Sequence, residues 1–338
     1  MEFINHDLQA HNPSVYHLVG CSAGWTGMKP RISEFSYGFA LTNELVGWAE
    51  LSAAPVFPSL IEEGRAGGGY DVKLERPGVP LFLQFKRSEF LTRRSGREAR
   101  EIAKTGARIG IPYYRFAVTE SWKSDQHELL LALDVAPNFV FYAAPRFYRV
   151  DEINAAWHAN AVASRSIFVA PHQIGTLTDE PHAVAFDRQG VWVCSEPRRI
   201  ESLSSRDLAD KLLAALNQDE RPLRDKLGEL TDDLHAAEVR GRERIYQRSR
   251  EELARREEAL RRSYAERSAN SDQAAVDRIL PAWSVPSEDL AESEPPFEVP
   301  ESLPGRVAKD LAPELLQLRQ AADTAARLFD TQLVIVQP

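Results

Sequence analysis

Cysteine is scarce in this chain, with only Cys21 and Cys194 among 338 residues. Two cysteines so far apart exclude a disulfide framework and a four-cysteine zinc site. No stretch approaches the roughly 20 apolar residues that cross a bilayer, and the N-terminal segment has neither a basic start nor an apolar core. We therefore expect a soluble cytoplasmic protein that does not act at a membrane.

Several familiar site motifs are also missing. The chain lacks the glycine-rich sequences GxxxxGK[ST] and GxGxxG, so we expect neither hydrolysis of ATP or GTP nor binding of a dinucleotide. The spacing of His172, His182 and Cys194 follows no usual zinc pattern. Ser195 lacks the flanking glycines of a nucleophile elbow. Arg146 follows an apolar run and could contact phosphate, but no mechanism can be attached to it from the sequence.

Charge is present in excess but unevenly distributed. Acidic residues outnumber lysine and arginine by 50 to 41, giving a formal net charge of −9. Between residues 86 and 115 the balance is reversed, with nine lysine or arginine residues against three glutamates. Residues 279–305 contain no lysine or arginine and are rich in proline and acid, which is typical of an extended acidic linker. The chain thus carries a basic region within an acidic whole.

Hydrophobic periodicity predicts an alternation of helices and strands over the first two thirds of the chain. Strands are expected at residues 113–118, 139–145, 166–171, 183–187 and 191–195. Helices are expected at residues 37–51, 95–112, 125–135, 150–162 and 204–217. Because strands continue to about residue 195, we interpret residues 1–200 as one mixed α/β domain.

Two short alternating segments, 70–75 and 80–86, flank a Pro-Gly turn and predict a β-hairpin. In the register that this turn favours, Asp71 lies opposite Gln84, and Lys86 shares their face. The hairpin would then gather an acid, an amide and an ammonium group. Taken alone, the pattern equally fits the solvated polar face of an amphipathic hairpin.

The order of these residues resembles the PD-(D/E)XK nuclease superfamily, also called restriction-endonuclease-like. Its pattern is an acid on a first helix, then Asp, and then an acid-x-Lys sequence on the next strand. Here Asp71 precedes Gln84-Phe85-Lys86, with glutamine in place of the usual acid, a variant that some members carry. A short strand could also form at Val56-Phe57 or Leu60-Ile61, and the resulting helix-strand-strand-strand-helix-strand order of residues 37–118 matches the family core. The resemblance implies an α/β fold with a mixed sheet flanked by helices.

The resemblance also implies a Mg²⁺- or Mn²⁺-dependent site. Asp71 would be the central ligand, the Gln84 side chain and the Phe85 carbonyl would offer neutral oxygens, and Lys86 would neutralise charge in the transition state or position the attacking water. Because Gln84 removes one negative charge, the site has a greater need for a further acid.

Glu44 is the favoured source of that acid. It lies one turn from Leu41 and Trp48 on the apolar stripe of the 37–51 helix, so its carboxylate could reach over the hairpin. A partly exposed helix glutamate is the simpler alternative. Glu62 and Glu63 are rival candidates on an expected loop.

A cationic stripe is predicted on the 95–112 helix, where basic residues recur every three or four positions. Its members are Arg97, Arg100, Lys104 and Arg108. Nucleic-acid phosphate is the obvious counterpart. A salt-bridged helix face is the alternative, because Glu98 and Glu101 lie nearby.

The C-terminal third differs in character. Residues 201–270 are a helical charged region, in which residues 229–267 form a long exposed helix or a helical hairpin; residues 271–305 are the acidic, Pro-rich linker. Residues 306–338 combine an amphipathic helix with a terminal strand, and we expect them to dock on another protein or a second copy of this chain. Truncation after Ser293 would then leave the N-terminal domain folded.

Together these observations predict a metal-dependent nuclease, with DNA favoured over RNA as its substrate. The resemblance implies bacterial restriction, repair or anti-phage defence, and the docking tail favours a defence effector controlled by a partner. Two alternatives stay open. One is a non-catalytic interaction subunit whose Gln84 site no longer binds metal, and the other is an RNase on the same fold.

Overall fold

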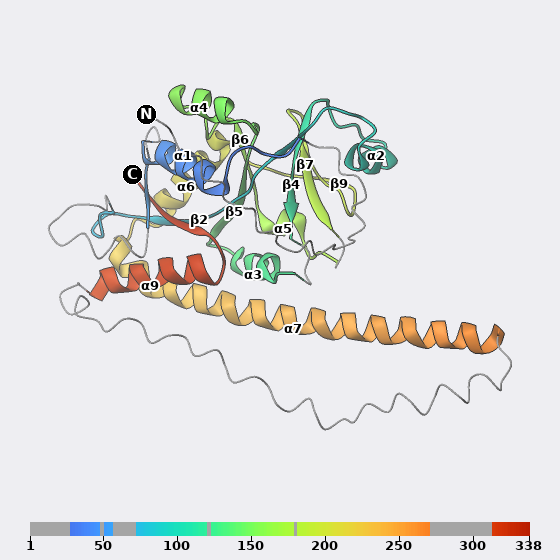
Figure 1. The fold of residues 1–338 in the computed structure, drawn as a ribbon. Helices are drawn as coiled ribbons and strands as arrows, with labels where there is room; N and C mark the ends of the chain where they lie inside the picture. Colours follow the sequence, from blue (N-terminus) through green and yellow to red (C-terminus); the bar gives the residue numbers. More distant parts are fainter. Residues whose placement is uncertain (1–27, 48–50, 57–71, 120–122, 179–180, 271–312) are drawn as a thin grey trace, which may run out of the picture.

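The computed structural model describes residues 28–47, 51–56, 72–119, 123–178, 181–270 and 313–338. Within them the chain forms a mixed α/β fold with two five-stranded sheets and eight helices. Figure 1 shows the two sheets in the body of the molecule and one long helix running beneath and beyond it. The α/β class predicted from the sequence is confirmed. None of the helices in the described ranges is both long and apolar enough to cross a membrane.

The first sheet, which we call the mixed sheet, joins strands from distant parts of the chain. Its order is β1-β10-β2-β5-β6, and only β2 and β5 are parallel. The strands are β1 (Ser52–Pro55), β10 (Gln332–Gln337), β2 (Val79–Phe85), β5 (Phe139–Pro145) and β6 (Ser166–Val169). The last strand of the chain therefore lies between the first two.

The predicted hairpin of residues 70–75 and 80–86 is wrong. β2 forms as expected, but β10 and β5 occupy its two edges, and residues 72–78 form turns and a bridge rather than a strand. The reason is burial. Leu333–Val336 is a continuous apolar run that is fully buried, whereas an alternating segment leaves one polar face that a central position cannot accommodate.

The C-terminal segment belongs to the core of its own chain. Helix α9 (Pro313–Arg327) buries Leu318, Ala322 and Ala325, and Phe329 joins the same hydrophobic cluster before β10 enters the sheet. The expectation that residues 306–338 dock on another chain is therefore wrong, and residues 1–200 do not close the sheet by themselves. The 271–305 linker lies outside the described residues.

The second sheet, the antiparallel sheet, comes from residues 89–200. It contains β3 (Glu89–Leu91), β4 (Tyr113–Val118), β7 (His182–Phe186), β8 (Val191–Val193) and β9 (Arg198–Ile200), in that order. The strands predicted near 113–118, 183–187 and 191–195 are confirmed. One hydrophobic cluster joins the two sheets and includes Phe82 and Tyr142 from one and Phe116 and Phe186 from the other.

One face of the mixed sheet packs toward the antiparallel sheet, and helices cover the other face. α1 (Glu34–Val46), α4 (Val150–His158) and α6 (Ser205–Gln218) pack on that face, while α3 (Gln126–Leu133) lies against the long helix. The short helices are α2 (Arg97–Lys104) and α5 (Pro171–Ile174). α1 begins earlier than predicted because the Ser33 hydroxyl caps it, accepting a hydrogen bond from the Ser36 N–H at 2.9 Å.

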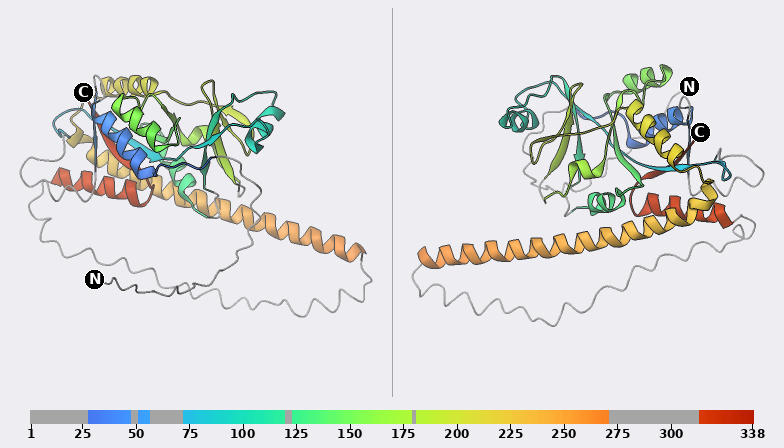
Figure 2. Two further views of the ribbon diagram at one scale, coloured as in Figure 1. Left: turned by 45° about the horizontal axis from the view of Figure 1, so that its top comes forward. Right: turned by 180° about the vertical axis from the view of Figure 1, so that it is seen from behind.

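The long helix α7 (Leu223–Asn270) spans 48 residues without a break, so the single long helix is the correct one of the two predicted alternatives. Its first half buries Leu227, Leu230 and Leu234 in the core shared with α3 and α9. Its second half projects away from the body and exposes Leu253 and Leu260 (Figure 2). Intrahelical Glu-to-Arg pairs four residues apart stabilise this projecting half.

Candidate functional site

Gln84 and Lys86 lie at the C-terminal end of β2, as the sequence predicted. Gln84 is buried beside Tyr142 of β5, and its side-chain Oε1 has no hydrogen-bond partner among the residues that the structure describes. Lys86 follows β2 directly and is half-buried, with its Nζ 5.6 Å from the centre of the Tyr142 ring. Its backbone N–H donates to the Ala143 carbonyl at 2.9 Å, so β5 fixes the position of this residue.

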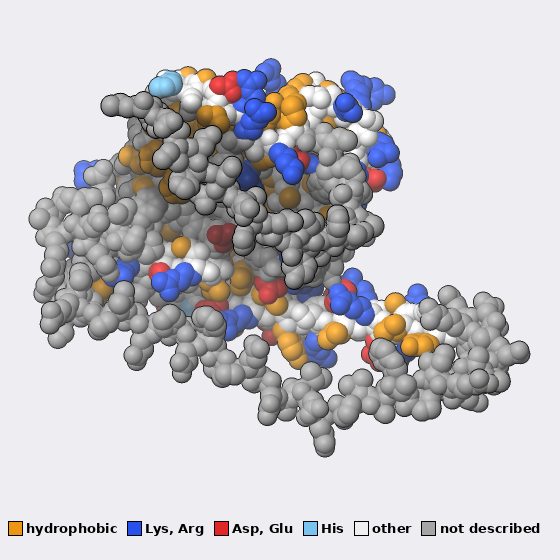
Figure 3. Space-filling view, in the orientation of Figure 1, with side chains coloured by type: hydrophobic (Ala, Val, Ile, Leu, Met, Phe, Trp, Pro, Cys, Tyr) orange, Lys and Arg blue, Asp and Glu red, His pale blue; other side chains and the backbone are white. Residues whose placement is uncertain are grey.

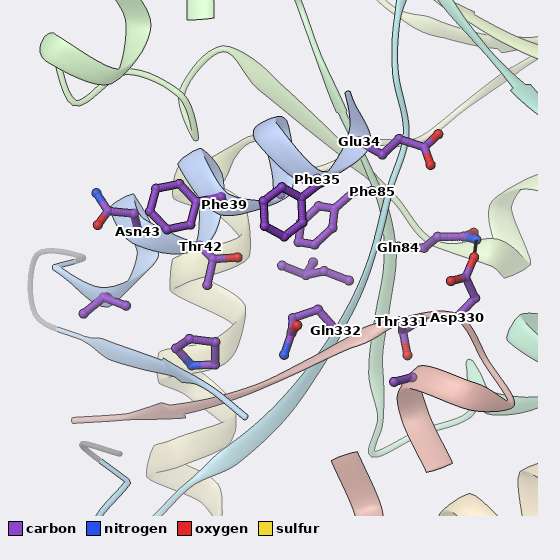
Figure 4. Close-up of a pocket in the computed structure, with 15 residues that line it drawn as sticks. Glu34, Phe35, Phe39, Thr42, Asn43, Gln84, Phe85, Asp330, Thr331 and Gln332 are labelled. Carbon is purple, nitrogen blue, oxygen red and sulfur yellow. Dashed lines mark hydrogen bonds between the residues drawn. The ribbon is translucent and has the colours of Figure 1, made fainter. Parts of the chain in front are cut away.

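The acid beside Gln84 is Asp330, which the sequence analysis did not identify. The Asp330 carboxylate accepts a hydrogen bond from Gln84 Nε2 at 3.4 Å (Figure 4). It accepts another from Gln126 Nε2 at the start of α3. Asp330 lies in the turn between α9 and β10, with a positive φ of 50° that Asp tolerates better than most residues. The pairing of β10 with β2 is what brings it here.

Two carboxylates act electrostatically on Lys86 and favour its charged form. Burial lowers the pKa of Lys86, while Glu34 and Asp330 act in the opposite direction and raise it. Glu34 lies in the first turn of α1 and forms an ion pair with Arg87, whose Nε lies 3.8 Å from the Glu34 carboxylate. The site thus combines an ammonium group, an amide and two acids from three separate elements.

A buried pair of rings forms the floor beneath Lys86. The Tyr142 hydroxyl donates to His127 Nδ1 at 2.8 Å, and His127 Nε2 donates to the Gly175 carbonyl at 2.7 Å. Burial lowers the pKa of His127 to about 4 and raises that of Tyr142. Both rings are therefore neutral near pH 7 and hold a fixed position under the ammonium group.

A hollow of about 660 Å³ opens next to this cluster, between α1 and the mixed sheet. Its wall is aromatic, with Phe35 and Phe39 of α1 exposed at 83% and 56% of their surface. Its polar end carries Glu34, Gln84 and Asp330 (Figure 4). The hollow is large enough for a planar organic group next to the charged cluster.

The other predicted ligands are placed elsewhere or lie outside the described residues. The Glu44 carboxylate accepts hydrogen bonds from the backbone N–H groups of Val162 and Ala163, at 2.6 and 3.2 Å. It therefore fastens α1 to the loop after α4 and is not brought to Gln84. Phe85 pairs with Ala143 in the sheet. Asp71, Glu62 and Glu63 lie outside the described residues.

The predicted cationic stripe lies on α2, which packs against the antiparallel sheet away from the β2 label of the mixed sheet (Figure 1). Arg97, Arg100 and Lys104 are exposed on α2, and Lys104 pairs with Glu101 at 2.7 Å. Helix α2 ends at Lys104, so Arg108 lies in the following loop, where it is also exposed. Figure 3 shows lysine and arginine side chains gathered over this end of the body.

The set of donors can be compared with the needs of a hard cation, which prefers several oxygen ligands. Nowhere in the described part of the chain do three or more His, Cys, Asp or Glu residues form a group suited to a metal ion. The cluster does offer the Asp330 carboxylate, the Glu34 carboxylate and the unpartnered Gln84 Oε1. A cation bound to Gln84 Oε1 would supply the partner that this buried oxygen lacks, so the chemistry of the donors fits a weakly held Mg²⁺ or Mn²⁺.

Comparison with known proteins adds no further constraint: no family model, curated protein or solved structure matches this chain.

Proposed function

We propose that this chain is a metal-dependent nuclease of the PD-(D/E)XK type, which hydrolyses phosphodiester bonds and favours DNA over RNA. The observation that carries the proposal is the placement of Asp330 against Gln84 and next to the half-buried Lys86. This cluster has the residue types of the family pattern. In this proposal its aspartate is Asp330, in the turn that precedes β10, and not Asp71.

Each residue of the cluster has a role in this proposal. Asp330 and the Gln84 oxygen would hold the cation, and Glu34 would contribute the acid of the first helix. A bound Mg²⁺ or Mn²⁺ would polarise the phosphate and lower the pKa of a bound water. Lys86, fixed over the Tyr142 ring, neutralises the negative charge that develops on the phosphate in the transition state.

Asp71 remains a second candidate for the metal ligand on the grounds of sequence alone. The proposal does not extend to a defence effector controlled by a partner. That role depended on a free docking tail, and the tail is part of the core.

A non-catalytic subunit with the same fold is the second candidate function. The observation that favours it is the neutral side chain of Gln84, which leaves Glu34 and Asp330 as the carboxylates acting on Lys86. A site with fewer charges binds a hard cation less tightly. The two functions differ in a direct assay.

The test is to incubate the purified full chain with plasmid, linear DNA, single-stranded DNA and RNA, each with Mg²⁺, Mn²⁺ or EDTA. We expect cleavage of DNA that EDTA abolishes, and a loss on the order of 100-fold in Lys86→Ala, because a positioned charge is lost. Lys211→Ala, an exposed lysine on α6 across the mixed sheet, is the matched control. Undiminished cleavage by folded Lys86→Ala would contradict the site, and no cleavage by the wild type would favour the non-catalytic subunit.

A further inference from the structure

Arg146 follows β5 directly, just as Lys86 follows β2. Because β2 and β5 are parallel, with Phe85 beside Ala143, both cations leave the same edge of the mixed sheet. Their surroundings differ. Lys86 has two carboxylates nearby, whereas the Arg146 Nε is buried without a hydrogen-bond partner and its guanidinium forms no ion pair with any residue that the structure describes.

Arg146 lies between two hollows of about 840 and 580 Å³. Both are bounded by Arg146 and by the β7–β8 turn at Asp187–Gln189. Arg199 lines the larger hollow, and Arg165 lines the smaller one. A ligand could therefore reach the guanidinium from either side.

Asp187 is an acid that acts electrostatically on Arg146, but both of its carboxylate oxygens accept hydrogen bonds from backbone N–H groups. Oδ1 accepts from the N–H groups of Gln189 and Gly190 at 2.6 and 2.9 Å, and Oδ2 accepts from the Gly110 N–H. These bonds hold the β7–β8 turn against the loop before β4. The carboxylate thus has a structural task and forms no ion pair with Arg146.

Neighbouring arginines increase the positive charge. Burial lowers the pKa of Arg146, Asp187 raises it, and Arg188 lowers it again. Arg188 is exposed, lines both hollows and forms no ion pair within the described part of the chain. Arg165 donates to the Arg146 carbonyl at 3.3 Å and lies over the Phe147 ring, which keeps a third cation at the same place.

The Arg146 side chain is half-buried and has no counter-ion among the described residues, and a partly desolvated charge of this kind is costly unless a ligand supplies the counter-charge. The guanidinium group presents a rigid fork of donors that matches the oxygens of a phosphate. We propose that Arg146 and Arg188 form a binding site for a phosphate group. The phosphate comes either from a free phosphorylated compound or from the backbone of a nucleic acid. This site does not depend on the proposed cleavage reaction.

The test measures binding in EDTA, where the proposed cleavage cannot occur. Inorganic phosphate, followed by calorimetry, and a fluorescein-labelled single-stranded oligonucleotide, followed by anisotropy, are titrated against the wild type and three variants. The variants are Arg146→Ala, Arg188→Ala and Arg149→Ala. Arg149 is the matched control, because it is exposed nearby and is paired with Asp151.

We expect Arg146→Ala to weaken binding of at least one probe by tenfold or more, which corresponds to about one lost charge-assisted contact. Arg188→Ala should weaken it less, and Arg149→Ala should leave it unchanged. An effect on the oligonucleotide alone identifies the nucleic-acid backbone as the source, and an effect on inorganic phosphate identifies a free phosphate group. If Arg146→Ala does not fold, the binding of both probes by Arg188→Ala is compared with that by Arg149→Ala instead. Weaker binding by Arg188→Ala then supports the proposal, and equal binding overturns it.

Absence of binding of both probes to the wild type would overturn the proposal. So would equal binding by Arg146→Ala and Arg149→Ala. Thermal unfolding without ligand separates binding from a structural role: since the Arg146 charge has no partner, its removal should not lower the melting temperature. If the wild type binds phosphate but does not cleave nucleic acid, the proposed nuclease function is contradicted and the proposed phosphate site is not.

Discussion

The two sheets of this protein are built in different ways. The antiparallel sheet comes from residues 89–200, and two of its four neighbouring strand pairs, β7–β8 and β8–β9, are joined by short turns. The mixed sheet needs β1 and β10, which come from opposite ends of the described chain and pair with each other. The antiparallel sheet lies next to the exposed arginines of α2. The candidate site lies on the mixed sheet, which is complete only when β10 is in place.

This difference explains why the candidate site and the cationic stripe are separate. Gln84 and Asp330 are 246 residues apart, and they meet only when β10 inserts between β1 and β2. The stripe on α2 needs no such closure. We therefore expect substitutions in the mixed sheet to affect folding or catalysis, and substitutions on the antiparallel side to affect binding alone.

The largest effect should follow removal of the C-terminal segment. Truncation after Ser293 deletes α9 and β10, which separates β1 from β2 and exposes the buried β2 residues Leu81 and Phe82 that pair with β10. We expect the truncated chain to aggregate or to lose its cooperative thermal transition, measured by circular dichroism and light scattering. A truncated chain that melts like the full-length protein would show that β10 is dispensable, contrary to the sheet order.

A smaller, local test uses one core residue of β10. Ile335 is fully buried in the cluster between the sheets, so Ile335→Ala should lower the free energy of unfolding by about 2–5 kcal/mol. Leu253→Ala on the projecting half of α7, where the side chain is 66% exposed, should change it by less than about 0.5 kcal/mol. Urea unfolding of both variants measures the contrast, and equal costs would contradict the burial of β10.

Replacing exposed cations on the antiparallel side should weaken nucleic-acid binding without unfolding the protein. The triple variant Arg97→Gln, Arg100→Gln and Arg108→Gln should flatten the salt dependence of binding by about 0.9 log unit per lost contact on duplex DNA. A matched triple on α7, Arg255→Gln, Arg261→Gln and Arg262→Gln, removes cations that are paired within the helix. An unchanged salt slope in the first triple would place the stripe away from the nucleic acid.

The smallest effect is expected at Gln84. Gln84→Glu adds a negative charge beside Asp330, which should lower the Mg²⁺ concentration for half-maximal cleavage because charge strengthens a hard-cation site. The variant should keep its activity, measured as initial rate against Mg²⁺ concentration. Complete inactivation with unchanged folding would mean that the Gln84 amide contacts something other than metal.

Local features of this fold were predictable from the sequence, and long-range ones were not. β4, β5 and the helices near residues 126, 150 and 205 follow from periodicity, since their patterns are set within a few residues. Gln84 and Lys86 share a strand end, which is also local information. Nothing in the sequence says that β10 pairs with β2, so Asp330 could not be found.

Two smaller errors have the same origin. The alternation of residues 70–75 fits a strand, but β10 is more apolar and takes the place beside β2. Glu44 had the right spacing on α1, yet a loop that lies more than a hundred residues away supplies the N–H groups that bind its carboxylate. A third error is local: Glu34 was missed because the capped start of α1 precedes the predicted helix.

The central claim is that closure of the mixed sheet delivers the acid of the site. It is tested most directly by the rate of Mg²⁺-dependent DNA cleavage in Asp330→Asn, since Asn tolerates the positive φ at this position and keeps the fold. We predict a loss on the order of 100-fold with an unchanged melting temperature, while Asp323→Asn, an exposed acid on α9 paired with Arg327, retains the wild-type rate. Wild-type cleavage by folded Asp330→Asn would contradict the claim.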